Sequence, residues 1–288
     1  MATTRTTTAR ARARDADVGG EMFDDGDARE DETYAAGRLA AMVNAYGDAA
    51  LTSASGTSMA TYVRDGVAEL SWRGRMMFMD RLSSQGIENA WTIAGEGYEL
   101  TRRERAAFAG STSEEDFHVV NEIIGDGIED GEAVVFEGKV GRLPGSFLNR
   151  FSKAFYVEED DDPLRSEPAV KLFGRASIKK GPLDALLPLY FASNDIGDDA
   201  VFIPGTDERA DVSLDYRNVP VLPSKRPSAA RAGGVSWPAP RLALFPFDSL
   251  VDYLRPLAPG VLVGRGYRFT TGSSKRFLDF ILVRRDRE

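Results

Sequence analysis

The chain has 288 residues, a formal net charge of -9 at pH 7, no cysteine and a single histidine, His118. The lack of cysteine excludes thiol nucleophiles, disulfides and cysteine-rich metal sites, and one histidine excludes a multi-histidine metal centre. The negative charge argues against nucleic acid as a partner, because phosphate binding needs a positive field. No apolar run approaches the roughly 20 residues of a membrane-spanning helix. The sequence therefore indicates no cofactor and leaves carboxylate chemistry, hydroxyl chemistry or no chemistry.

The first part of the chain, residues 1–32, has an unusual composition. Residues 1–14 contain threonine, alanine and arginine without any acidic residue, and residues 15–32 are strongly acidic. Neither half has apolar periodicity, so we predict that residues 1–32 are disordered. An acid-free start of this kind is typical of an organelle transit peptide and would direct the protein to the chloroplast. A plain flexible tail on a cytoplasmic protein is the other interpretation.

Residues 33–130 are predicted to form a mainly helical section. Over 33–50, apolar residues recur at helical spacing and alanines fill the gaps. The acidic residues of 113–116 mark another helix start, because the helix dipole favours negative charge there. The remaining elements expected in this section are a mixed, partly helical segment over 59–79, a turn at 85–86, a short strand over 91–93 and a helix start at 101.

After Gly131 the pattern changes to short β-rich runs separated by turns, in which apolar residues alternate at period two, as at Val134 and Phe136. About eight strands at this spacing indicate an antiparallel barrel or sandwich over 131–286. The fold class predicted for the whole chain is therefore α+β. Strands are expected over 133–140, 153–158, 170–178, 201–204, 212–216, 241–247, 261–269 and 276–285, with one helix over 182–190 and a long loop over 220–240.

The segment 55–61, Ser-Gly-Thr-Ser-Met-Ala-Thr, resembles the nucleophile segment of subtilisin-like proteases, in which the serine opens a helix. Three features oppose that function. Tyr62 stands where the family has proline, no histidine precedes Ser58, and too few residues lie upstream to build the sheet that presents the triad. We therefore expect Ser58 or Thr57 to cap a helix.

Other polar motifs favour structural interpretations. A lone histidine on a half-apolar helix, as His118 is expected to be, is more often packed or exposed than catalytic. The acidic run 158–162 lacks the glycine turn of a calcium loop and is expected to be a solvated loop. The segment Gly264-Arg265-Gly266 lacks the lysine and helix of a phosphate loop, and it predicts a kink or bulge in a strand.

Residues 135–286 resemble calycin (lipocalin-like) barrels in a series of short motifs. One such family carries Gly-x-Trp-x-Gly followed by a Leu-Pro-x-Gly turn, and the corresponding segment here is 138–145, Gly-Lys-Val-Gly-Arg-Leu-Pro-Gly. The chain departs from that family at Val140, which replaces the tryptophan. The later motifs in the same order are Lys153-Ala154-Phe155, Asp162-Pro163-Leu164, Phe247-Asp248, Val251-Asp252-Tyr253, Gly264 and 280–285.

The end of the chain also resembles plastid lipid-associated proteins (fibrillins). The matching segments are Asp-Tyr-Leu-Arg at 252–255, Gly-Arg-Gly at 264–266, and a closing apolar strand. Both resemblances imply an eight-stranded barrel, which is about wide enough to hold one small apolar ligand. A filled barrel without a cavity is the alternative.

Three functions follow from the whole sequence as hypotheses: first, non-catalytic binding of a lipid or other apolar small molecule; second, an enzyme using carboxylate or hydroxyl chemistry at the barrel mouth; third, a structural or interaction protein with a filled barrel. An arginine inside the barrel would suit an acidic head group such as a fatty acid carboxylate. In the last strand, Phe280 should point inward and Ile281 should lie on the more exposed face beside Asp279. The candidate ligand-binding residues are Phe136, Phe155, Tyr156, Phe173, Phe245, Tyr253, Arg255, Arg265, Tyr267 and Phe280.

Overall fold

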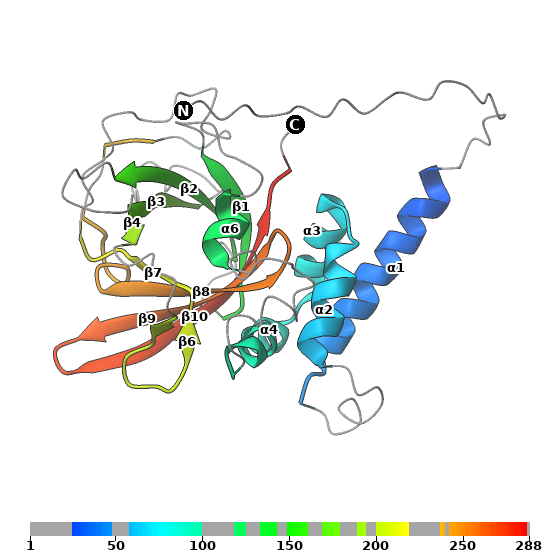
Figure 1. The fold of residues 1–288 in the computed structure, drawn as a ribbon, viewed down its shortest axis with the longest axis horizontal. Coiled ribbons are helices and arrows are strands. Elements are labelled where there is room, and N and C mark those ends of the chain that lie inside the picture. Colours follow the sequence, from blue (N-terminus) through cyan, green and yellow to red (C-terminus); the bar gives the residue numbers. More distant parts are fainter. Residues whose placement is uncertain are drawn as a thin grey trace, which may run out of the picture.

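The computed structural model has helices in its N-terminal part followed by a closed antiparallel β barrel, so the predicted α+β class is confirmed and the barrel is favoured over a sandwich. Most of the helices lie together on one side of the barrel, and the short helix α6 (Val119–Ile124) instead packs on the interior core of the barrel (Figure 1). The structure describes residues 25–47, 58–99, 118–124, 133–142, 149–160, 169–178, 189–193, 200–218, 237–239 and 242–286.

Three of the helices in the described ranges begin at serine caps. Ser58, Ser71 and Ser83 each accept a hydrogen bond from the backbone N–H three residues further on, which satisfies a donor that the helix itself leaves unpaired. The expected role of Ser58 as an N-cap is confirmed. The helices are α1 (Asp25–Asn44), α2 (Met59–Ala68), α3 (Trp72–Arg81), α4 (Ser84–Gly95), a 3₁₀ helix η1 (Glu96–Glu99) and α6 (Val119–Ile124).

Two local predictions in the helical section are wrong. The turn expected at 85–86 and the strand expected over 91–93 both lie within α4. The cap at Ser83 starts a helix there, and one face of that helix is buried on the barrel, which overrides the strand preference of Trp91 and its neighbours. The helix starts expected at 101 and 113 lie outside the described residues.

The boundary of the predicted tail also needs correction. Helix α1 begins at Asp25, so residues 25–32 are helical. The last residue of this segment contacts the start of α3. Glu32 Oε1 accepts a hydrogen bond from the backbone N–H of Ser71, the N-cap of α3, at 2.6 Å. Residues 1–24, and with them the disorder and transit peptide predictions for that part, lie outside the described residues.

Eight of the described strands close into one barrel with the neighbour order β1-β10-β9-β8-β7-β4-β3-β2, and all of its pairs are antiparallel. The first and last strands pair with each other, as Val140 with Phe280, and so remove the open edge. The strands of the barrel are β1 (Val134–Val140), β2 (Arg150–Asp160), β3 (Ala169–Ile178), β4 (Leu189–Ser193), β7 (Val212–Asp215), β8 (Leu250–Ala258), β9 (Val261–Thr270) and β10 (Ser273–Arg284), with β5 (Val201–Phe202) and β6 (Arg209–Ala210) forming a separate hairpin.

The strand predictions fail at four places. Of the run expected over 201–204, only the two residues of β5 form a strand, and it lies in the separate hairpin and not in the barrel. Residues 242–247 form no strand but a turn, closed by the Phe247 N–H donating to the Leu244 carbonyl. The helix expected over 182–190 is wrong at Leu189 and Tyr190, which belong to β4, while its earlier residues lie outside the described ranges. Strand β8 was not predicted, because it is buried on both faces and its apolar residues therefore do not alternate.

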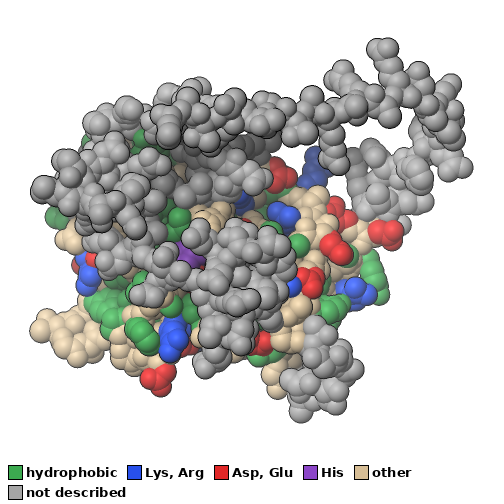
Figure 2. Space-filling view, viewed as in Figure 1, with side chains coloured by type: hydrophobic (Ala, Val, Ile, Leu, Met, Phe, Trp, Pro, Cys, Tyr) green, Lys and Arg blue, Asp and Glu red, His purple; other side chains and the backbone are tan. Residues whose placement is uncertain are grey.

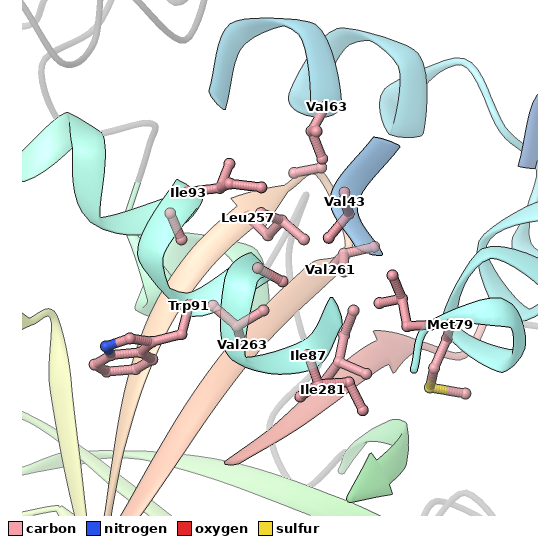
Figure 3. Packing of buried hydrophobic residues seen from close by; sticks show 14 of the residues in the cluster. Val43, Val63, Met79, Ile87, Trp91, Ile93, Leu257, Val261, Val263 and Ile281 are labelled. Atoms are coloured by element: carbon pink, nitrogen blue, oxygen red, sulfur yellow. The ribbon is translucent and has the colours of Figure 1, made fainter. Parts of the chain in front are cut away.

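Helices α1 to α4 cover the outer face of β8, β9 and β10 and form the larger apolar core with them (Figure 3). Ile87 and Met79 from the helices pack in one cluster with Val263 and Ile281 from the strands. The final strand is thus buried on both faces along much of its length. The expectation that the Ile281 side would be the more exposed one is wrong, because a helical layer and not solvent lies against it.

The barrel interior holds the second core, in which three glycines accommodate aromatic rings. Each glycine pairs directly with a phenylalanine of the adjacent strand, and a Cβ on it would lie about 2.5 Å or less from that ring. Gly264 therefore makes room for the ring of Phe280. The three pairs are Gly138–Phe151, Gly174–Phe191 and Gly264–Phe280. An irregularity of the kind expected at Gly264-Arg265-Gly266 lies at the Gly266 end, where the β9–β10 register shifts between Arg276 and Leu278, the partners of Tyr267 and Gly266.

Candidate functional site

A cavity of about 60 Å³ lies inside the barrel, at the end where β1, β3, β7 and β9 finish. This volume exceeds the roughly 10–15 Å³ that a cavity needs to hold one water molecule. Its lining is apolar except for three side chains, Lys153, Tyr216 and Asp252. The full set of lining residues is Val140, Phe151, Lys153, Ala176, Leu189, Tyr216, Phe247, Leu250, Asp252, Leu278 and Phe280.

The three polar side chains form one hydrogen-bonded cluster. The Lys153 ammonium Nζ donates to Asp252 Oδ2 at 2.5 Å, and the Tyr216 hydroxyl donates to the same oxygen at 3.0 Å. The side chains of Lys153 and Asp252 are only 2% and 3% exposed, so both charges of this ion pair lie out of water. The second carboxylate oxygen, Asp252 Oδ1, is buried and receives no hydrogen bond from any described residue.

Burial dominates the electrostatics of this cluster. Desolvation lowers the pKa of Lys153, and the neighbouring Asp252 carboxylate opposes that shift. Burial also raises the pKa of Tyr216 well above its usual value, with a further contribution from Asp252, so the phenol stays protonated and donates. The Lys153 Nζ lies 4.4 Å from the centre of the Phe280 ring, where the π face favours a cation. The amine is therefore held between a carboxylate and an aromatic ring.

The barrel strands place the cluster through their alternation. Lys153 stands between Phe151 and Phe155 on the inward face of β2, and Asp252 stands between two inward leucines on β8. Gly266 of β9 faces Asp252 in the strand register, and a Cβ there would lie 2.8 Å from Asp252 Oδ1. The second glycine of Gly264-Arg265-Gly266 thus leaves space for the buried carboxylate.

Three of the residues expected to bind a ligand do point into the barrel. Phe280 lines the cavity. Phe136 and Phe155 pack against each other edge to face, with ring centres 5.4 Å apart, and belong to the interior core without lining the cavity. One end of the barrel is therefore filled by aromatic rings and the other end is open enough to contain a cavity.

Four other candidates lie on the outer face of the barrel, and their expected inward orientation is wrong. Tyr253 and Tyr267 belong to the core beneath the helices. The Arg255 guanidinium lies 4.0 Å from the centre of the Trp91 ring and donates to the Trp91 carbonyl, and Arg265 pairs with Glu208 and Asp279. Both arginines join the helical layer and the β5–β6 region to the barrel, so neither provides an anchor for an acidic head group inside it.

The remaining three candidates are also outside the barrel. Tyr156 and Phe173 form a small outer cluster with Tyr190 and Trp237 on the face of β2, β3 and β4. Phe245 is 74% exposed and lies in the turn before β8. Their inward orientation is likewise corrected. The inward phase of each strand depends on its register in the closed barrel, and short strands do not reveal that phase from sequence alone.

The polar cluster itself was not predicted as a site. Lys153 and Asp252 stand in the motifs that resemble lipocalin-like barrels, and Tyr216 stands at the end of an expected strand. The sequence does contain a signal for Lys153, because it lies two residues from both Phe151 and Phe155 and therefore shares their face of the strand. A charged residue in the apolar phase of a strand is a candidate for a buried functional group.

His118 and the remaining acidic side chains are weaker candidates for a functional site than this cluster. His118 precedes α6, its Nδ1 accepts from the Val120 N–H, and its Nε2 lies 4.0 Å from Asp211 Oδ2. Its side chain is only 15% exposed, and the small purple area in Figure 2 is the exposed part of this histidine. In the described ranges, no group of three or more histidine, aspartate or glutamate side chains is arranged to hold a metal ion.

The fold and its interior cavity define this protein as an eight-stranded barrel with an attached helical layer and a buried lysine–aspartate–tyrosine cluster. Comparisons with protein-family models, with curated proteins and with solved structures found no match to this chain. Among the helices of the described ranges, none combines the length and apolar character needed to cross a membrane.

Proposed function

We propose that this protein is a non-catalytic binder of an apolar small molecule, held in the barrel cavity with its polar end at Lys153, Asp252 and Tyr216. The observation that carries this proposal is a polar cluster placed in an otherwise apolar cavity. Binding sites for small molecules commonly have this composition: an apolar lining with a few converging polar groups that fix orientation. The resemblance of residues 135–286 to lipocalin-like barrels supports the same function.

A purely structural role explains the ion pair less well. Removing a lysine and an aspartate from water is unfavourable, and an apolar pair of similar volume is often equally stable or more stable. Asp252 Oδ1 adds to this, since no described residue donates to it and a buried acceptor without a donor is destabilising. A ligand hydroxyl could donate to Asp252, or a ligand carbonyl could accept from Lys153 or Tyr216. Such binding would explain why the cluster is present, whereas its contribution to folding would not.

The charges of the cluster favour an uncharged ligand. Lys153 and Asp252 together have no net charge, so a ligand carboxylate would gain from the ammonium and be repelled by Asp252. The arginines expected to bind a fatty acid carboxylate, Arg255 and Arg265, lie outside the barrel. A neutral alcohol, ketone or aldehyde with a short apolar chain therefore fits this site better than a free fatty acid.

The test uses the cavity leucines as reporters. Pentanol is titrated into the protein labelled with ¹³C at its leucine methyl groups, and the methyl resonances are followed by NMR. We expect saturable shifts at Leu250 and Leu278, which line the cavity, and none at Leu257 in the outer core. Shifts that are absent, or that never saturate, would contradict the proposal.

A filling variant gives the matched control. Ala176 lines the cavity on β3, and Ala176→Leu should abolish the shifts because the added atoms occupy the space. Ala192 belongs to the outer cluster on the adjacent strand β4, and Ala192→Leu should leave pentanol binding unchanged. Native mass spectrometry of the purified protein, before and after solvent extraction, tests whether an apolar molecule is carried from the cell.

A chloroplast location is a further proposal, supported only by the composition of residues 1–14. Fusion of residues 1–32 to a fluorescent protein tests it in plant or algal cells. Fluorescence confined to chloroplasts would support the transit peptide, and fluorescence throughout the cytoplasm would favour the plain tail.

A further inference from the structure

We propose that Lys153 forms a reversible imine with an apolar aldehyde bound in the barrel cavity. This inference rests on the proposed function, because the aldehyde must first enter the apolar cavity. It goes beyond that function in assigning a covalent role to one residue and a chemical class, the carbonyl compounds, to the ligand. The site combines an amine, a carboxylate and a phenol within an apolar lining.

The position of the Lys153 amine is suited to attack on a carbonyl carbon. Its side chain is 2% exposed, and it lines the cavity together with Phe280 and Leu250. Desolvation in an apolar pocket is one of the ways in which proteins activate a lysine amine, and burial lowers the pKa of Lys153.

A comparison with Lys139 shows what is special about this amine. Lys139 Nζ donates to the backbone carbonyls of Met79, Asp80 and Leu82 at 2.6–3.3 Å, so its hydrogen bonds hold the end of α3. Lys153 instead donates to a carboxylate, Asp252, which can accept its proton. Of these two amines, only Lys153 lines the cavity.

The reaction balances with groups already present. The Asp252 carboxylate takes one proton from the Lys153 ammonium, and the nitrogen lone pair forms a bond to the aldehyde carbon. A second proton moves from nitrogen to the former carbonyl oxygen. The Asp252 carboxyl group then returns its proton to that hydroxyl, the carbon–oxygen bond breaks and water leaves. Nitrogen keeps one proton, so the product is an iminium ion beside the Asp252 carboxylate, and no oxidant or reductant is needed.

The experiment traps the imine by reduction. The full-length protein is incubated with pentanal and sodium cyanoborohydride at pH 7, and the modified residues are mapped by tandem mass spectrometry. We expect Lys153 to be alkylated at least ~10-fold faster than the exposed Lys275, because its amine is activated by its surroundings. Pentanol should compete with this labelling, since it occupies the same cavity without a carbonyl.

The variant Lys153→Met/Asp252→Asn removes both charges together and should fold, bind no aldehyde covalently and show no trapping above that of its exposed lysines. Its circular dichroism and melting temperature report folding. If pentanol binds the wild-type cavity but Lys153 is labelled no faster than Lys275, the imine is refuted while the binding function stands. If pentanol does not bind and Lys153 is also unlabelled, both proposals are refuted.

Discussion

The ring of Phe280 on β10 lies over the bare Cα of Gly264 on β9, its direct partner in the barrel register. A Cβ at position 264 would lie 2.1 Å from Phe280 Cζ, far inside any normal contact. The same ring faces the Lys153 amine at 4.4 Å and lines the cavity. This glycine therefore fixes the position of an aromatic side chain on which both the barrel core and the candidate site depend.

The first prediction follows from that contact. Gly264→Ala should destabilise the protein by about 1–3 kcal/mol, because the new methyl group forces the Phe280 ring out of place. Urea denaturation measures the change. In the double variant Gly264→Ala/Phe280→Leu the clash is removed, so the two effects should be less than additive by at least ~0.5 kcal/mol. Simple additivity would show that the two residues do not interact.

The second prediction concerns the two faces of β10. Phe280 and Ile281 are 1% and 0% exposed, respectively, so each is buried in its own core. Phe280→Ala should destabilise the protein by about 3–5 kcal/mol and Ile281→Ala by about 2–5 kcal/mol. Comparable losses of unfolding free energy would confirm that helices cover the outer face. If Ile281→Ala lowered the free energy of unfolding no more than a substitution at an exposed residue such as Lys275→Ala, the burial of this face would be contradicted.

The third prediction concerns the buried ion pair. Lys153→Met alone leaves the Asp252 charge uncompensated inside the barrel and should lower the free energy of unfolding by about 3–5 kcal/mol. The double variant Lys153→Met/Asp252→Asn should recover most of this loss, because an asparagine oxygen can still accept from Tyr216. Chemical denaturation of the three proteins gives the comparison. A double variant less stable than Lys153→Met would show that the carboxylate is needed for folding.

The fourth prediction concerns the start of α1. The Glu32 carboxylate accepts from the Ser71 N–H and lies over Gly74, where a Cβ would come within 2.4 Å of Glu32 Oε1. Glu32→Ala should lower stability by about 1 kcal/mol through loss of this hydrogen bond. Asp31→Ala, at the exposed neighbour, should change stability by less than ~0.5 kcal/mol. A chain beginning at Thr33 should melt below one beginning at Asp25; equal melting temperatures would refute the contact.

The fifth prediction is a pH dependence at α6. Burial raises the pKa of Glu122, although its carboxylate accepts from the Gly260 N–H at 2.7 Å and two arginines partly oppose the shift. The folded protein thus binds this proton more tightly than the unfolded chain, and this contribution to stability is lost as pH rises through the folded-state pKa. Glu122→Gln should therefore be more stable than wild type at pH 7. The difference should vanish below the usual glutamate pKa of about 4.3.

Denaturation curves of both proteins at neutral and acidic pH provide the measurement for Glu122. The amide oxygen of the variant can still accept from Gly260, so the comparison isolates the charge. A stability difference that stays constant with pH would mean that the ionisation of Glu122 plays no part.

Much of the barrel could be predicted, since strands such as β1 carry their own alternation and are bounded by turn residues. The local sequence alone predicted a cap at Ser58 or Thr57, and the structure shows that it is Ser58. The residues of the candidate site were harder to predict from the sequence. Phe280 was placed correctly, but Arg255 and Arg265 were placed inside the barrel when they lie beneath α4 and beside β5–β6. Their strands are buried on both faces, so alternation gives no indication of which side is the interior.

By itself, the sequence determined the α+β class and the antiparallel strands, because helical and strand periodicities are local properties that each segment carries. Only the tertiary structure decided which face of each strand is inside. Closing β1 against β10 sets the register, and the register brings Lys153 of β2 and Asp252 of β8 together although 99 positions separate them in the chain. Packing of α1 to α4 on β8, β9 and β10 then buries Ile281, because two apolar surfaces that meet exclude water whatever the local pattern of either one.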